Sequence, residues 1–131
     1  MNEDQIAKGQ EQLRLMAGSF GQAMVDKVKR ESPELAQFVL GFGFGEIYAR
    51  EGLSYRDKEM LSIASLVSQG DTANQLRFHF SAALTCGLTE REVTEILIHC
   101  IPHVGIPKVM NAFNVFGALL KERQTSEEPG D

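Results

Sequence analysis

The chain has 131 residues, of which 43% are hydrophobic and 24% are charged, and its formal net charge is −5 at pH 7. This length suits one domain with a hydrophobic core. The acidic balance argues against nucleic acid and against an anionic membrane as partners, and no apolar run is long enough to cross a bilayer.

The first third of the chain predicts helices. Apolar residues recur at helical spacing in 2–16 and again in 20–30. Ser32 and Pro33 indicate a helix start, because serine caps a helix well and proline suits its first turn. This third helix is expected to run to about Ala49. Glycines at alternate positions interrupt it and indicate close backbone contact or a local kink: Gly41, Gly43 and Gly45.

Two further helices are predicted in the middle of the chain. Ser54 is expected to cap a nearly all-apolar helix, which ends at a turn over residues 69–71. Asp71 is expected to cap the helix that carries His79, and Gly87 is expected to end it.

The last third predicts two more helices and a tail. Thr89 and Glu92 form a capping box at the start of a helix over 90–103. A final long helix is expected from Pro107 to about Lys121. The sequence therefore predicts an all-α domain of about six helices over residues 1–123, followed by a polar, disordered tail over residues 124–131.

The two cysteines, Cys86 and Cys100, lie too far apart in the sequence to predict a redox pair. The N-terminus is polar and acidic, unlike a secretory signal. A cytoplasmic protein with both thiols reduced is the simplest interpretation. Cys86 is expected to be a small, buried apolar residue.

The helix that carries His79 places Ala83 and Gly87 on the same face, because the three residues are four apart. An imidazole on a tightly packed apolar helix is costly unless it is hydrogen-bonded or used in chemistry. Two interpretations stay open for His79: a core histidine that donates to a carbonyl, or a general acid or base.

Two more histidines, His99 and His103, lie four apart on one predicted helix, a spacing that could chelate a metal. The sequence has no HExxH motif and no third ligand at an obvious spacing. We therefore expect no metal site.

Three segments resemble the carboxymuconolactone decarboxylase family, which belongs to the AhpD-like superfamily. They are residues 44–54 (FGEIYAREGLS), residues 75–91 around His79, and residues 105–112 (GIPKVMNA). The match runs from about Lys8 to Leu120. It implies a compact, all-α AhpD-like fold that assembles as a homo-oligomer, a trimer or a hexamer, with sites at subunit contacts.

The resemblance also implies a site. His79 aligns with the family histidine, and Glu46 would be its partner in proton transfer; the alternative for Glu46 is a solvated ion pair with Arg50. Arg50 and Arg77 match family arginines and would hold substrate carboxylates, although solvated ion pairs are equally compatible with the sequence. His103 would line the pocket.

The implied function is that of a cofactor-independent decarboxylase. Its substrate would be a small carboxylated lactone such as 4-carboxymuconolactone, and no metal would be needed. An AhpD-like peroxidase or disulfide reductase is disfavoured, because Thr72 and Gln75 stand where that group has its CxxC cysteines. A non-catalytic oligomeric binding protein stays open, because Gln75 and Ser81 replace the usual glutamate and arginine of the decarboxylases.

Overall fold

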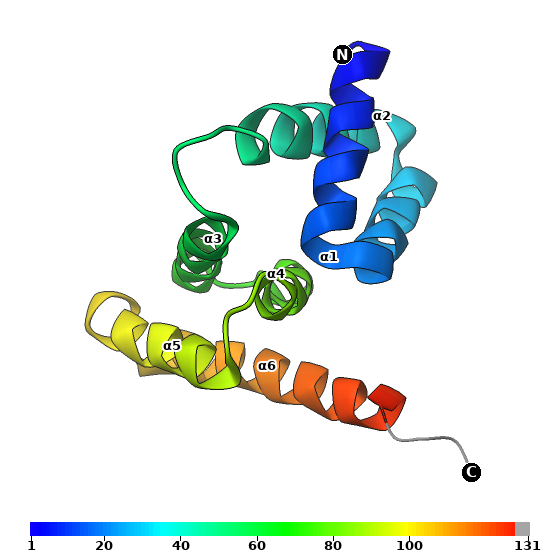
Figure 1. Ribbon diagram of the computed structural model, residues 1–131. Coiled ribbons are helices and arrows are strands. Elements are labelled where there is room, and N and C mark those ends of the chain that lie inside the picture. Colours follow the sequence, from blue (N-terminus) through cyan, green and yellow to red (C-terminus); the bar gives the residue numbers. More distant parts are fainter. Residues whose placement is uncertain (128–131) are drawn as a thin grey trace. The chain divides into compact units, whose positions relative to one another are not determined.

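The computed structural model describes residues 1–127, which form six α-helices, one π-helix and no strand (Figure 1). The all-α prediction is confirmed. The elements in chain order are α1 (Glu3–Glu31), α2 (Pro33–Gln37), η1 (Phe38–Tyr48), α3 (Tyr55–Gln69), α4 (Ala73–Thr85), α5 (Glu90–Val104) and α6 (Ile106–Glu127). No helix within the described range is long and apolar enough to span a bilayer.

The chain divides into two compact units, Met1–Lys58 and a second unit that begins at Glu59. The boundary falls inside α3, where the sequence offers no linker. Each unit has its own buried apolar residues. In the first these include Leu13, Met16, Val25, Leu40 and Phe44, and in the second Ile63, Phe80, Val93, Leu97 and Leu119.

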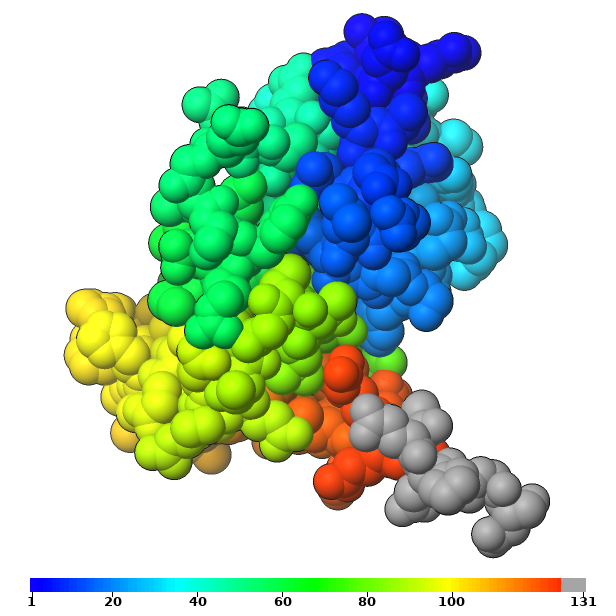
Figure 2. Space-filling model, in the orientation of Figure 1, coloured from blue at the N-terminus to red at the C-terminus, as the bar shows by residue number. Residues whose placement is uncertain are grey.

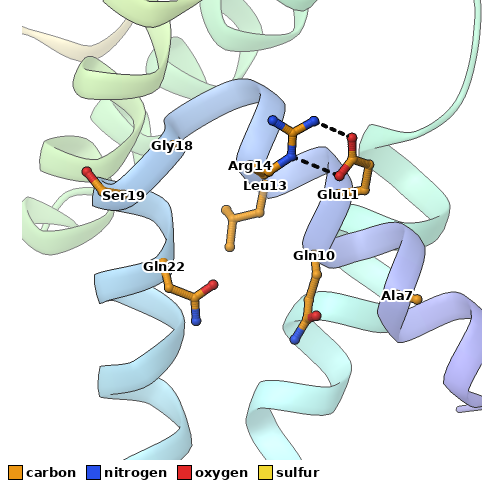
Figure 3. Close-up of a pocket in the computed structure, with 8 residues that line it drawn as sticks. All are labelled: Ala7, Gln10, Glu11, Leu13, Arg14, Gly18, Ser19 and Gln22. Carbon is orange, nitrogen blue, oxygen red and sulfur yellow. Dashed lines mark hydrogen bonds and ion pairs between the residues drawn. The ribbon is translucent and has the colours of Figure 1, made fainter.

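In the first unit, the backbone at Gly18 is not helical and divides α1 into two helical arms, as the two predicted helices require. Gly18 has φ 53° and ψ −135°, a conformation that glycine adopts without the strain imposed by a Cβ. The two arms on either side correspond to the predicted segments 2–16 and 20–30 (Figure 3). Asn2 and Gln5 form a capping box at the start of the first arm.

The glycine-rich segment is a π-helix, η1, packed closely against α1. A Cβ on Gly45 would overlap the Gln5 carbonyl oxygen and lie 3.0 Å from that of Leu40. A Cβ on Gly9 of α1 would overlap the Leu40 carbonyl group. The two glycines therefore let the backbones of α1 and η1 approach, as the alternate glycines had suggested.

The second unit is built from α4, α5, α6 and most of α3. The helices α5 and α6 form a hairpin through Gly105, and α4 packs against α6, where the Phe80 and Phe116 rings lie 4.9 Å apart (Figure 1). Gly87 has φ 100° and ends α4 in a Schellman motif, in which the Leu88 amide donates to the Ala83 carbonyl.

Most predicted helix starts are confirmed, and one is wrong. Ser32 and Ser54 accept hydrogen bonds from the backbone three residues on, and Thr89 forms the capping box with Glu92. The residue at the start of α4 is Thr72 and not Asp71, because Asp71 takes a left-handed conformation with φ 52° in the preceding turn.

The last helix is longer than the sequence suggested. It continues through residues 124–127, the first part of the predicted tail, and the Thr125 hydroxyl donates to the Lys121 carbonyl one turn earlier. Gln and Glu favour helices, so this polar segment can extend α6. The rest of the predicted tail, residues 128–131, lies outside the described residues.

Candidate functional site

The strongest candidate site is a buried histidine–carboxylate pair in the second unit. His79 on α4 places its Nδ1 atom 2.8 Å from Oε2 of Glu59 on α3. The Glu59 side chain is completely buried, whereas that of His79 is 14% exposed. His79 is therefore the member of the pair that solvent or a ligand can reach.

The position of Glu59 follows from the apolar face of α3. Glu59, Ile63 and Val67 are four apart and all buried, so this face turns the carboxylate into the unit. Sequence reasoning missed Glu59. A signal was present, because an acidic residue stood on the same helical face as Ile63 and Val67.

The second carboxylate oxygen of Glu59, Oε1, bears on what chemistry the pair can perform. Among the described residues, Oε1 is buried and has no hydrogen-bond partner. An unpaired buried carboxylate oxygen is costly, more so if the group is charged. The contact of Oε2 with the His79 imidazole places a group that can carry a proton beside this buried carboxyl group. The arrangement therefore suits proton transfer.

Glu46, the partner predicted for His79, is exposed on η1 in the first unit. Its carboxylate accepts a hydrogen bond from the Gln5 side chain, and not from Arg50 as the alternative interpretation had it. The burial that motivated a proton-transfer role is found at Glu59 and not at Glu46.

Arg50 lies in the turn that follows η1, and a lysine holds this turn. The Nζ atom of Lys58 donates to the carbonyls of Tyr48 and Arg50, at 2.7 and 2.6 Å. The Arg50 side chain is exposed and, within residues 1–127, pairs with no carboxylate. It can therefore meet an anionic ligand.

Arg77 is engaged, because its guanidinium forms an ion pair with Glu122 of α6. This is the ion-pair alternative left open by the sequence. Both side chains are more than a third exposed, and pairs of this kind contribute little to stability. His103 is exposed near the end of α5, beside the His99 ring. In the described part of the chain, no three His, Cys, Asp or Glu side chains are grouped to hold a metal ion.

The thiol of Cys86 lies at the end of α4, half-buried. Burial, together with the negative charge of the Glu59 carboxylate, raises the pKa of Cys86 to about 11. Burial also raises the pKa of Cys100. Because the thiolate is the reactive form of cysteine, these raised pKa values disfavour both residues as peroxide-reducing nucleophiles.

The raised pKa of Cys86 predicts that its thiol reacts slowly. In a Cys100→Ser variant at pH 8, we expect Cys86 to react with a disulfide reagent roughly 100-fold more slowly than free cysteine, because little thiolate is present. The rate should rise with pH up to about 11. Unfolding in guanidinium should restore the normal rate and serves as the control. A native rate equal to that of free cysteine would contradict the argument.

A cavity of about 460 Å³ lies in the crook of α1, between the two arms that meet at Gly18 (Figure 3). It is lined by Gln10, Ser19 and Gln22 and by the ion pair of Glu11 with Arg14, among others. None of the residues predicted for the site lines this cavity, so it does not mark their position.

Comparison with known proteins shows the family of the chain. A model of the carboxymuconolactone decarboxylase family matches residues 33–118, about two thirds of the chain, and this range includes Glu59 and His79. The 4-carboxymuconolactone decarboxylase of Acinetobacter baylyi is 28% identical over 89 residues, which cover 68% of this chain but only 66% of that enzyme. An uncharacterized 15.0 kDa protein of Paracoccus denitrificans is 26% identical over 121 residues, 92% of this chain and 90% of that protein.

Proposed function

Because the chain belongs to the carboxymuconolactone decarboxylase family, we propose that it is a cofactor-independent decarboxylase of a small carboxylated lactone such as 4-carboxymuconolactone. The observation that carries the proposal is the contact between the buried Glu59 carboxylate and the partly exposed His79 imidazole. The relative from Acinetobacter baylyi, named for this activity, supports the choice of substrate.

The proposed reaction needs an electron sink and a proton. When the carbon–carbon bond to the carboxylate breaks, CO₂ leaves and the electron pair passes into the lactone carbonyl as a dienolate. Protonation at carbon then gives the enol-lactone of 3-oxoadipate. In our proposal His79 delivers this proton as general acid, and Glu59 stabilises the imidazolium that precedes the transfer.

Substrate carboxylates would be held by arginine. Arg50 is exposed on a turn that Lys58 holds in place, so its guanidinium can form a two-point contact with a carboxylate. Arg77 could do the same by exchanging Glu122 for the substrate. Glu46 and His103 remain candidates for further contacts.

We also propose that the protein is a homo-oligomer, a trimer or a hexamer. Three large apolar side chains on α2 and η1 are about half exposed or more, and their spacing of three and four residues is typical of one helix face: Leu35, Phe38 and Phe42. Light scattering at micromolar concentration tests this, and a monomer would contradict it.

The experiment for the activity is direct turnover. The purified chain is mixed with 4-carboxymuconolactone, and the loss of substrate is followed by ultraviolet absorbance together with the CO₂ released. We expect multiple turnovers without added metal or cofactor. Substrate binding without turnover would favour the binding-protein alternative, and neither binding nor turnover would reject this substrate class.

A further inference from the structure

Two histidines lie together on the surface of α5. His99 and His103 are four residues apart, both are exposed, and their ring centres are 5.8 Å apart. The sequence alone led us to expect no metal site, but from this arrangement of the rings we propose that they form a two-histidine binding site for a divalent first-row transition metal, with Cu²⁺ held most tightly.

The geometry fits such a chelate. An imidazole nitrogen binds a metal of this kind at about 2.0 Å, so two rings that share one metal ion have their centres about 5 Å apart. The observed separation is slightly larger, and rotation of exposed side chains can close it. Helical spacing of four residues already places both rings on one face.

The helix beneath the pair is well anchored. Val93, Leu97 and Cys100 are buried on another face of α5, and the capping box at Thr89 fixes its start. Glu95 lies one helical turn before His99, and its carboxylate forms an ion pair with Arg91 at 2.8 Å. The site would therefore have two imidazole ligands, with water in the other positions.

Imidazole ligands select the metal class. Neutral nitrogen donors suit copper, nickel and zinc, whereas calcium and magnesium prefer oxygen. Among the divalent ions that imidazole binds, affinity rises from Ni²⁺ to Cu²⁺ and falls again at Zn²⁺. Two protein ligands without a third give a moderate affinity, roughly micromolar for Cu²⁺.

Pro102 gives metal binding a structural consequence. It lies between the two histidines inside α5 and has no N–H, so the Ile98 carbonyl lacks its usual donor four residues on. A metal held by His99 and His103 would join the two sides of this weakened turn. The surface around the turn between α5 and α6, yellow in Figure 2, is open to solvent in that view.

The test uses the full chain and Cu²⁺ alone. Calorimetric titration should give one site of moderate affinity per chain, and electron paramagnetic resonance should show two nitrogen donors. His99→Ala and His103→Ala should each weaken binding by about tenfold or more and leave one nitrogen donor. Glu90→Gln, at the start of α5 and more than two turns from the pair, is the control and should change affinity by less than about twofold.

A second readout follows the turn itself. Cu²⁺ should slow amide hydrogen exchange near the end of α5 in the wild type and not in the double variant His99→Ala, His103→Ala. Because these histidines are exposed, the variants should fold. Equal Cu²⁺ affinity in the double variant, or nitrogen donors unchanged by either substitution, would show an adventitious ion elsewhere and overturn the proposal. Neither readout depends on the proposed decarboxylation.

Discussion

Replacing His79 with alanine is expected to lower kcat for 4-carboxymuconolactone by about 100-fold or more, the scale on which general acid–base catalysis is lost. The physical reason is that the imidazole is the reachable member of a pair whose carboxylate is completely buried. KM should change much less, because in the proposed mechanism His79 delivers the proton while the arginines hold the substrate carboxylates. Steady-state kinetics on the purified variants measure both constants.

Glu59→Gln is the companion variant, because it removes the charge and keeps the size. We expect a fall in kcat of similar order, since the amide cannot stabilise an imidazolium. Glu95→Gln, which removes an exposed carboxylate on α5, is the matched control and should keep kcat. If His79→Ala keeps the wild-type kcat, His79 takes no part in the reaction, even if the protein is a decarboxylase.

Gly45→Ala is expected to destabilise the protein by about 3 kcal/mol, at the upper end of the usual cost of overpacking. The added methyl group would overlap the Gln5 carbonyl oxygen and lie 3.0 Å from that of Leu40. The Gln5 oxygen is a backbone atom of α1, so α1 and η1 would have to separate, and the Leu40 oxygen belongs to η1 itself, so that turn of η1 would also have to adjust. Chemical denaturation followed by circular dichroism measures the free energy of unfolding.

The control for this variant lies two residues away on the same helix. A Cβ on Gly43 would find its nearest neighbour, the Phe38 carbonyl oxygen, at 4.0 Å. Gly43→Ala should therefore be neutral or stabilise the protein by up to about 1 kcal/mol, because alanine favours helices over glycine. Equal destabilisation by the two substitutions would mean that close contact between α1 and η1 is not what requires Gly45.

Features encoded by short-range chemistry could be predicted from the sequence. Ser32, Ser54 and Thr89 start helices because a hydroxyl meets backbone amides three residues on, and that pattern is visible in the sequence. The π-helix could not be predicted, because residue preferences do not separate its hydrogen bonding from that of an α-helix. The N-cap of α4 was predicted one residue too early, at Asp71 in place of Thr72, because the backbone conformation of Asp71 depends on the preceding turn.

The site was harder to predict, because its key contact joins distant residues. His79 could be found from its helix and from the family motif, but Glu59 is twenty residues earlier and owes its burial to packing. Glu46 attracted the assignment because its neighbours are apolar and glycine, yet the side chain itself is exposed. The pairing of Arg77 with Glu122 likewise brings two distant helices together.

The most direct test of the account is kcat of the double variant His79→Ala, Glu59→Gln, measured beside both single variants. When two groups act as one unit, removing the second after the first lowers kcat little further. We therefore predict that the double variant is about as slow as His79→Ala alone, and that Glu46→Gln in the His79→Ala background shows no comparable coupling. If the effects of His79→Ala and Glu59→Gln multiply, the two residues act independently and the proposed proton-transfer pair is contradicted.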